Sequence, residues 1–596
     1  MNLQFINKNK LKENNFAFSI LLVIGFGILA MFPAYVWGIP IGADMDNHFR
    51  FVLPFYDEII KGNYVPGWLA ESNNNFGDAR FRFYPPALYY LLCLFRFFTT
   101  DWYVAALAVI TLFSVVGTLG VYFWAGQSLS NQTAVLAALI FAIVPYHLTQ
   151  FYQASLLAEY AATALLPFAF MFVERLMTNR DRLNCGQDFL FQQLFNVAGL
   201  AVVYSLLITT HLPSTVIASL SLGIFALLLT DWKDNKKGLL FCALGIALGL
   251  ISSSWYWIKM ISELGWIQAG EKVSSPYYEY QNNFAFSPYA LVNLNTWYAS
   301  VLVALTIAIF SPSLLILGQI FKKDSVEKNN SIQNLITNYF ADYQSKLTIR
   351  KRLKAAILIA FLSLLMTTDL SRPFWAIIPK LKDVQFPYRW LTVASVAICP
   401  TVALSFQIWL RHIKQKRVRP VQLVLLLSFV IAVYMTIQDL VLDSGYTPRD
   451  KFLARIDETR GGRSFNDWLP RGARELKDLL PLQGQIDAGK RKVTVTNWQS
   501  QTRNFAVETG DESQARARSY YYPLWQAFIV KNGARIPTLT SQAEDGTLLI
   551  VLPPEAVDIE LIFDEPPRTK ISFIISIFGW VVILVLAITV FFRVKN

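Results

Sequence analysis

Long uninterrupted runs of apolar residues constrain this sequence most. The run 571–592, for example, contains no Asp, Glu, Lys or Arg. A helix of about 20 apolar residues is long enough to cross the hydrocarbon core of a bilayer. Of the 596 residues, 54% are hydrophobic and only 16% are charged, whereas soluble domains carry about 25% charged residues. The composition therefore excludes a disordered chain and an ordinary soluble enzyme, and it indicates a mainly α-helical polytopic membrane protein.

Hydropathy and length predict about twelve membrane-spanning helices. The predicted spans are 16–37, 102–126, 131–149, 155–174, 194–212, 213–230, 238–257, 296–321, 354–369, 389–410, 420–438 and 571–592. Lys and Arg gather in the loops after alternate spans, as they do in cytoplasmic loops. With twelve spans, these loops and both termini lie on the same side, so we expect cytoplasmic N- and C-termini.

The basic balance does not indicate a nucleic-acid partner. The net charge is +12, but most of the positive residues lie in the short loops between spans, where membrane topology explains them. The four cysteines, Cys93, Cys185, Cys242 and Cys399, show no paired spacing. The sequence therefore predicts neither a disulfide framework nor a zinc–cysteine site.

The first outward-facing segment, 38–101, carries a dense group of ionisable residues. Asp44, Asp46 and His48 follow directly on the first predicted span. Asp44 and Asp46 are candidate ligands for Mg²⁺ or Mn²⁺, since hard cations prefer carboxylate oxygens. Alternatively, one of them is a general base that deprotonates a hydroxyl, or Asp44 only caps the helix that follows. Spacing alone favours the helix cap.

Two short helices are expected on the outer face. Apolar residues at helical spacing predict an amphipathic surface helix at 45–62. The pair Pro85–Pro86 opens a second apolar helix at 86–98, which is too short to span the membrane.

Other ionisable residues fall at the outward ends of predicted spans. Glu159, His211 and Glu263 are of this kind, and such residues usually face a cavity or a partner, although a structural polar contact explains them equally well. The outward loop 369–389 is unusually basic. Its residues Arg372, Lys380, Lys382 and Arg389 suit a phosphate or diphosphate group, or they extend to lipid headgroups.

The region 439–570 differs from the rest in its pattern of apolar and polar residues. Alternating apolar runs around Asn532–Gly533, a strong hairpin signal, predict a small antiparallel β-sandwich. A helix-compatible stretch at 464–480 precedes it. The aromatic residues 520–522 and Trp525 either stack on sugar rings or pack in the core. We expect three parts: a transmembrane domain at 1–438, an extracytoplasmic β-rich domain at 439–570, and a final span with a cytoplasmic tail at 571–596.

The order of several weak motifs resembles a known group of proteins. The motifs are Gly42-Ala43-Asp44 with His48, Phe83-Tyr84-Pro85-Pro86, Glu159 before Pro167, His211-Leu212-Pro213, Glu263, Gln385-Phe386-Pro387-Tyr388-Arg389-Trp390, and Tyr522-Pro523-x-Trp525. The sequence resembles the bacterial YfhO-like and 6-pyruvoyl-tetrahydropterin synthase-related membrane families. Both are similar to the GT-C superfamily of polyprenyl-phosphate-sugar glycosyltransferases.

The resemblance implies a GT-C-like fold and an extracytoplasmic active site in the bacterial inner membrane. It implies that Asp44 is the catalytic carboxylate and that Asp46 completes an Asp-x-Asp pair, with a divalent metal as a possible cofactor. We expect His48 and Glu159 to assist catalysis and His211 and Glu263 to line the acceptor cavity. The donor phosphate is expected to contact Arg82, Tyr84, Arg372, Lys380, Lys382 and Arg389.

The implied reaction moves a sugar from a polyprenyl phosphate to a lipid, glycan or protein acceptor, among membrane lipids and without nucleic acid. No P-loop, GxGxxG, HExxH or Gly-x-Ser-x-Gly motif is present, which disfavours nucleotide-driven chemistry. Two alternatives remain at this point. One is a transporter or flippase of lipid-linked glycans, and the other is a non-catalytic assembly protein of the cell envelope.

Overall fold

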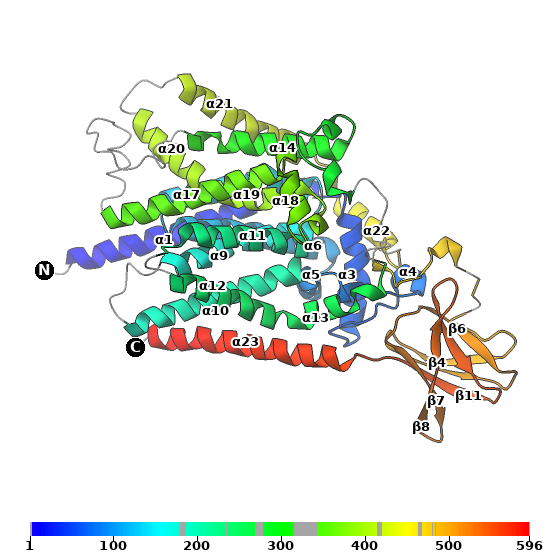
Figure 1. Cartoon of the computed structure of the whole chain (residues 1–596). Helices are drawn as coiled ribbons and strands as arrows, with labels where there is room; N and C mark the ends of the chain where they lie inside the picture. Colours follow the sequence, from blue (N-terminus) through cyan, green and yellow to red (C-terminus); the bar gives the residue numbers. More distant parts are fainter. Residues whose placement is uncertain are drawn as a thin grey trace.

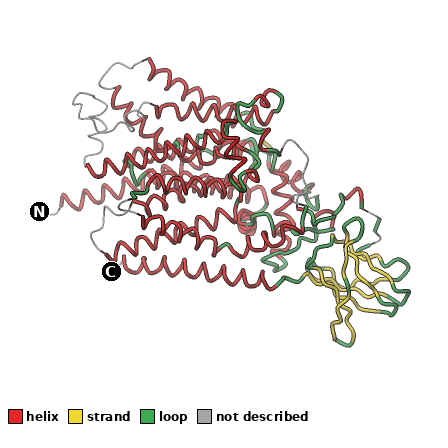
Figure 2. Tube along the Cα trace, in the orientation of Figure 1, coloured by secondary structure: helices red, strands yellow, loops and turns green. Residues whose placement is uncertain are grey.

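The computed structural model describes residues 3–178, 186–232, 236–268, 278–314, 343–413, 420–462, 468–479, 481–482 and 484–594. Figure 2 shows a large helical body with a strand-rich part at one end. Most of the Lys- and Arg-rich loops used to orient the chain, and Cys185, lie outside the described residues. The three described cysteines, Cys93, Cys242 and Cys399, are buried and form no disulfide.

Ten described segments form apolar spans by length and composition if each bent helix pair counts as one. The straight ones are α6 (Trp102–Ala125), α9 (Leu157–Thr178), α10 (Gly186–Thr210), α11 (Leu212–Leu229), α14 (Leu294–Phe310), α21 (Pro420–Met435) and α23 (Pro567–Val594). The bent pairs are α7 (Asn131–Ala142) with α8 (Pro145–Tyr152), α12 (Lys236–Ser252) with α13 (Ser254–Glu263), and α19 (Leu391–Ala397) with α20 (Cys399–Ile413).

Two further helices account for the difference from twelve. Helix α1 (Leu3–Leu29) contributes only a shorter apolar stretch, Phe16–Leu29. Helix α17 (Tyr343–Met366) is not among the ten. Mainly helical architecture with seven to ten apolar spans is therefore observed, and the count of twelve stays a prediction.

The end of the bundle opposite the termini carries the short elements. Both termini lie at one end, and the β-strands lie at the other (Figure 1). There α3 (Met45–Ile60) runs across the bundle axis, close to α22 (Arg449–Glu458). The remaining short helices are α2 (Phe32–Trp37), α4 (Ser72–Asn75), α5 (Ala87–Phe98) and α18 (Arg372–Ile377). Helices thus occupy both positions where surface helices are predicted.

Proline explains two of the three bends. Pro145 begins α8 and Pro400 follows the first residue of α20, and a proline supplies no backbone N–H to the preceding turn. The pairs bend by 42° and 44° at these breaks. The first break and the 3₁₀ turn Pro387–Trp390 before α19 thus interrupt the helices with non-helical backbone.

The C-terminal region forms two antiparallel sheets. Their strand orders are β3-β6-β10-β9 and β4-β5-β11-β7-β8. The strands are β3 (Ile486–Asp487), β4 (Val493–Trp498), β5 (Thr502–Val507), β6 (Ser513–Tyr520), β7 (Trp525–Lys531), β8 (Ala534–Thr538), β9 (Thr540–Gln542), β10 (Thr547–Leu552) and β11 (Val557–Phe563). Residues Asn532 and Gly533 form the predicted hairpin between β7 and β8, both with positive φ. The β-rich expectation is confirmed, while a closed sandwich stays a prediction.

Three details of the β-region differ from expectation. Strand β6 was not predicted, since its alternating Ala and Arg residues carry a weak apolar signal. The helix at 464–480 is wrong for the described residues, which contain only one 3₁₀ turn, Leu476–Asp478. Pro470 interrupts that stretch and forms a β-bridge with Ile267 instead. Tyr520, Tyr522 and Trp525 are buried in the core, so they are not free to stack on a sugar.

A two-stranded antiparallel sheet joins the N-terminal segment to the segment after α21. Strand β1 (Ile39–Pro40) pairs with β2 (Tyr446–Thr447), directly before the loop that leads to Asp44. Gly38 has φ +110°, and a Cβ there would lie 2.1 Å from the Thr447 carbonyl oxygen. Only glycine fits this close backbone approach.

Candidate active site

The loop that carries Asp44 is held by the end of α8. The Gly42 N–H donates to Ser155 Oγ at 2.9 Å, and the Asp44 N–H donates to the Ala154 carbonyl at 3.1 Å. A Cβ on Gly42 would lie 2.5 Å from the Gln153 carbonyl oxygen. Ser155 itself has φ +52°. Backbone contacts, rather than its own side chain, therefore fix the position of Asp44.

The Asp44 carboxylate remains half-exposed at the start of α3. Asp44 is the N-cap residue of α3, as the cap alternative expects, but its side chain makes no capping hydrogen bond to this described helix. Its Oδ1 accepts one hydrogen bond from Asn47 Nδ2 at 3.2 Å. The carboxylate thus keeps acceptor capacity for a substrate.

Asp46 has a different environment from Asp44. Both of its oxygens accept from Arg455 of α22, at 2.9 and 3.0 Å. Among the described residues, no group of three His, Cys, Asp or Glu side chains is placed to hold a metal ion. The pair does not fit a divalent metal as arranged. A metal requirement stays a prediction, and Asp46 would have to release Arg455 to meet it.

Arg389 and Glu159 form a buried ion pair near Asp44. Arg389 Nε lies 3.3 Å from Glu159 Oε2, and its Nη1 donates to the Val384 carbonyl at 2.7 Å. The guanidinium also lies over the Phe386 ring, at 5.0 Å from the centroid. Asp44 acts electrostatically on Arg389. Nη2 of Arg389 makes no hydrogen bond to a described residue, so these contacts leave it for a further acceptor.

Glu159 serves mainly as an anchor for that cation. Its Oε1 accepts from Tyr146 Oη at 2.5 Å, Thr392 Oγ1 at 3.0 Å and Gln150 Nε2 at 3.2 Å. Only Oε2 faces Arg389. With three donors on one oxygen and an arginine at the other, both oxygens of Glu159 are already engaged. Its predicted catalytic role stays untested, and this geometry favours a positioning role.

His211 presents one defined nitrogen to the site. It caps α11, and its Nδ1 accepts from the Ser214 N–H at 3.3 Å. A nitrogen that accepts cannot carry a proton, so the neutral ring holds its proton on Nε2. Arg389 and His48 both act electrostatically on His211. The neutral imidazole thus keeps an N–H on Nε2 for a further acceptor.

Tyr84 completes this group, the outer-end site of Asp44, Tyr84, His211 and Arg389. Its ring packs against Phe51 and Trp468, with centroids 5.1 and 5.9 Å apart. Burial and the Asp44 carboxylate raise the pKa of Tyr84 to about 12. Its hydroxyl therefore remains protonated at neutral pH and can donate a hydrogen bond. The four residues are grouped because Asp44 and Arg389 act electrostatically on Tyr84, Asp44 on Arg389, and Arg389 on His211.

His48 lies beneath the site rather than in it. Its Nδ1 lies 2.9 Å from Tyr89 Oη, and its Nε2 accepts from the Leu157 N–H at 3.2 Å. Burial, only partly offset by Asp44, lowers the pKa of His48 from 6.5 to about 4. The ring is therefore neutral at physiological pH.

This burial predicts a pH effect on stability. Between pH 6.5 and about 4 the unfolded chain protonates His48 and the folded chain does not, so stability falls as the pH falls through that window, by up to about 1.4 kcal/mol per pH unit. The Tm of the wild type, measured in detergent, should therefore drop more steeply over this range than the Tm of His48→Gln. Parallel curves would contradict the neutral assignment.

Arg82 and Glu263, both fully buried, belong to a separate network with the partly exposed Glu565. Arg82 Nη2 donates to Glu263 Oε1 at 2.7 Å and to Glu565 Oε2 at 2.9 Å. Tyr522 Oη donates to Glu263 Oε2 at 2.8 Å. A Cβ on Gly67 would lie 2.5 Å from Glu565 Oε1, so a larger residue there would displace the Glu565 carboxylate. The network joins the first outward segment, α13, the β-region and the start of α23, and it engages Arg82 away from the outer-end site.

The other predicted basic residues are exposed. Arg372 Nη2 pairs with Asp369 at 2.6 Å, and Lys380 Nζ pairs with Asp383 at 3.1 Å. Lys382 is also exposed. They therefore lie on the surface of the loop that leads to Arg389, and their predicted contact with a donor phosphate stays untested.

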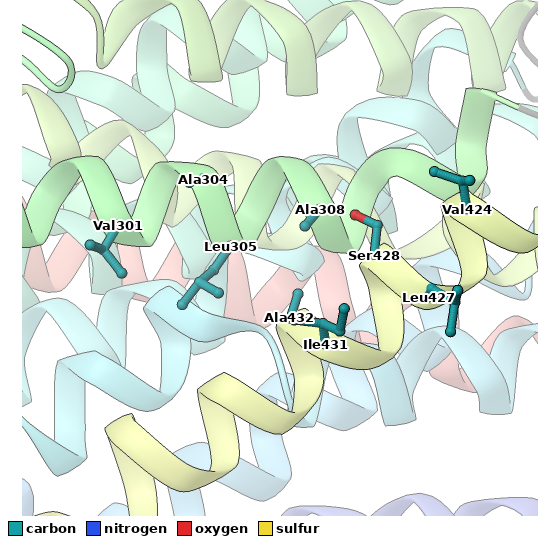
Figure 3. Close-up of a pocket in the computed structure, with 9 residues that line it drawn as sticks. All are labelled: Val301, Ala304, Leu305, Ala308, Val424, Leu427, Ser428, Ile431 and Ala432. Carbon is teal, nitrogen blue, oxygen red and sulfur yellow. The ribbon is translucent and has the colours of Figure 1, made fainter. Parts of the chain in front are cut away.

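An apolar groove lies elsewhere, between α14 and α21 (Figure 3). Figure 3 draws its lining residues: Val301, Ala304, Leu305, Ala308, Val424, Leu427, Ser428, Ile431 and Ala432. None is ionisable, so the groove suits an apolar chain and carries no chemistry of its own.

Several residues that build the site were not predicted. Tyr146, Thr392 and Gln150 hold Glu159, and Tyr89 contacts His48. The only sequence signal for them is a polar group inside an apolar segment, and a single chain does not reveal its partner.

Comparison with known proteins gives the family. The profile of the 6-pyruvoyl-tetrahydropterin synthase related domain, described as a membrane protein, matches residues 81–444. The match covers more than half of the sequence, and the chain belongs to this family of membrane proteins. No curated protein matches it.

Solved structures give only distant likenesses. Arabinofuranosyltransferase AftD from Mycobacteria matches with 15% identity and a TM-score of 0.43, over 72% of this chain and 27% of AftD. The Archaeoglobus fulgidus oligosaccharyltransferase with a tethered acceptor peptide matches with 12% identity and a TM-score of 0.35, over 75% of this chain and 56% of that protein. This chain thus spans about a quarter to a half of their lengths, and its function is inferred from the residues of the site.

Proposed function

We propose that the protein is a membrane glycosyltransferase of the GT-C type. It moves a sugar from a polyprenyl-phosphate donor to a hydroxyl of a lipid, glycan or protein acceptor. The observation that carries the proposal is the outer-end site, in which the accessible Asp44 carboxylate lies near Arg389 with Tyr84 and His211 as neutral donors. A base opposite an oxyanion-binding group is what a direct transfer of this kind needs.

The transfer is a single displacement at the anomeric carbon. Asp44 accepts the proton of the acceptor hydroxyl as its oxygen bonds to that carbon. The bond from the anomeric carbon to the phosphate oxygen breaks, and the electron pair leaves with the lipid phosphate. Arg389, His211 and Tyr84 stabilise the charge that develops there. The configuration of the sugar inverts.

The proposal also specifies on which side of the membrane the site lies. Helix α3, which begins directly after Asp44, lies at the end of the bundle away from both termini (Figure 1). With cytoplasmic termini and twelve spans, this end faces the outside of a bacterial inner membrane, where polyprenyl-linked donors are presented. The basic loops of the sequence support that orientation.

The phosphate contact is tested with Arg389→Lys. A lysine keeps the charge but loses the fork of donors, so we expect the KM for the donor to rise about tenfold or more. The measurement uses synthetic short-chain polyprenyl-phosphate sugars and protein in lipid nanodiscs. Lys380→Met, which removes an exposed, paired cation, should change KM by less than about threefold. The reverse ranking would place the phosphate on the exposed loop.

The activity itself is tested by release of free polyprenyl phosphate in that assay. We expect release from at least one donor sugar, and faster release when acceptor lipid or glycan is added. Movement of intact donor across the bilayer without release would instead indicate a transporter. If neither release nor movement of the donor is observed, a non-catalytic assembly role remains.

A further inference from the structure

We infer that Gln385 is a positioning residue, whose strained backbone turn fixes the guanidinium of Arg389 in the outer-end site. The inference rests on the proposed function, because Arg389 is the group that would bind the phosphate of the donor. It goes beyond that proposal by assigning the direction of Arg389 to the backbone of a loop residue four positions earlier in the chain.

Gln385 adopts a backbone conformation that residues other than glycine rarely take. Its φ is +68° and its ψ is −52°, which are close to the values of the rare and strained form of the γ-turn. The hydrogen bond that defines such a turn is present, since the Phe386 N–H donates to the Val384 carbonyl at 2.8 Å. Residues in sparsely populated backbone regions persist only where the surrounding structure imposes them, and they cluster at ligand-binding sites.

The turn brings two groups to the same guanidinium. The Val384 carbonyl, before the turn, also accepts from Arg389 Nη1 at 2.7 Å. Phe386, after the turn, has its ring centroid 5.0 Å from the guanidinium, and its carbonyl accepts from the Arg389 N–H at 3.1 Å. An extended backbone advances by about 3.3 Å per residue. Without the turn, the Val384 carbonyl and the Phe386 ring would therefore not both reach Arg389.

Packing holds the turn against the helical bundle. Val384 is buried, and the Phe386 ring stacks on that of Tyr388, with centroids 5.2 Å apart. At the other end of the guanidinium, Arg389 Nε lies 3.3 Å from Glu159 Oε2. The cation is thus held at Nε by the bundle and at Nη1 by the turn, and Nη2 is left for the oxygen of an anionic ligand.

The first test changes only the backbone preference of residue 385. In Gln385→Val, a β-branched residue resists positive φ, so we expect the KM for a short-chain polyprenyl-phosphate sugar to rise about tenfold and kcat to change by less than about threefold. Gln385→Gly adopts positive φ freely, so its KM should stay within about threefold of wild type and its Tm should not fall. A normal KM in Gln385→Val, or an equal rise in Gln385→Gly, would overturn the inference.

Asn532→Val is the matched control for strain in the backbone. Asn532 also has a positive φ, of +53°, but it lies in the hairpin between β7 and β8. The variant should lower the Tm and leave the KM for the donor unchanged. If both valine variants raise KM to the same extent, general destabilisation explains the effect, and the positioning role is overturned.

The second test needs no transfer activity. The fall in Tm caused by Gln385→Val should be smaller in an Arg389→Lys background, where the bond to the Val384 carbonyl is already weakened. Additive falls in Tm would contradict the link between the turn and Arg389. If the two changes are coupled but no donor is turned over, the turn holds Arg389 while the proposed transfer fails, so the two failures are distinguishable.

Discussion

Asp44→Asn will lower kcat for sugar transfer by about 10²- to 10⁴-fold, the usual contribution of a general base. The amide keeps the size of the side chain but cannot accept a proton from the acceptor hydroxyl. Because backbone bonds to Ser155 and Ala154 fix the loop, the variant should fold and bind donor normally. The measurement is release of polyprenyl phosphate at saturating donor, together with the Tm.

Two variants on the same helix control for lost charge. Asp57→Asn removes an ion pair with Arg460, and Asp46→Asn removes the one with Arg455. Both arginines are about half exposed, and such pairs contribute at most about 1 kcal/mol. We expect Asp57→Asn to retain near-normal turnover and Asp46→Asn to lose less than about tenfold. Equal losses in Asp44→Asn and Asp46→Asn would instead favour a paired metal site.

Arg82→Met will destabilise the fold strongly, by about 3–5 kcal/mol. Arg82 is fully buried and holds Glu263 and Glu565 together. Without it, Glu263 is left as a buried carboxylate without its strongest partner. Since the network joins four segments, we expect a marked fall in Tm and earlier proteolysis between the β-region and α23.

The control for Arg82→Met is Arg449→Met. Arg449 pairs with Asp101, but its side chain is 53% exposed, so its loss should cost at most about 1 kcal/mol. Adding Glu263→Gln to Arg82→Met should restore part of the lost Tm, because it removes the stranded charge. Equal effects of the two arginine variants, or no rescue, would contradict a structural role for the network.

Hydropathy predicted the helical fold well, because each span is defined by its own residues. The helix over Met45–Ile60 and the hairpin at Asn532–Gly533 followed from equally local signals. Contacts between distant segments could not be predicted in this way. Arg82 and Glu565 are 483 positions apart, and no pattern in either segment predicts their contact.

The same distinction holds for the site. Asp44 and Arg389 were recognised in outward loops and His211 at the end of a span, whereas Tyr84 was named only through the family resemblance. Local sequence did not separate Asp46 from Asp44, because the difference between them is Arg455, on a helix far along the chain. Nor did it reveal Tyr89, since a tyrosine in an apolar helix looks like ordinary core.

The most direct test of Asp44-dependent sugar transfer is mass spectrometry of envelope glycans and lipids in a null strain. The strain is complemented with wild type or with Asp44→Asn, and protein levels are matched. We predict that one sugar mass disappears in the null strain, returns with wild type and stays absent with Asp44→Asn. Full restoration by Asp44→Asn would contradict catalysis through Asp44.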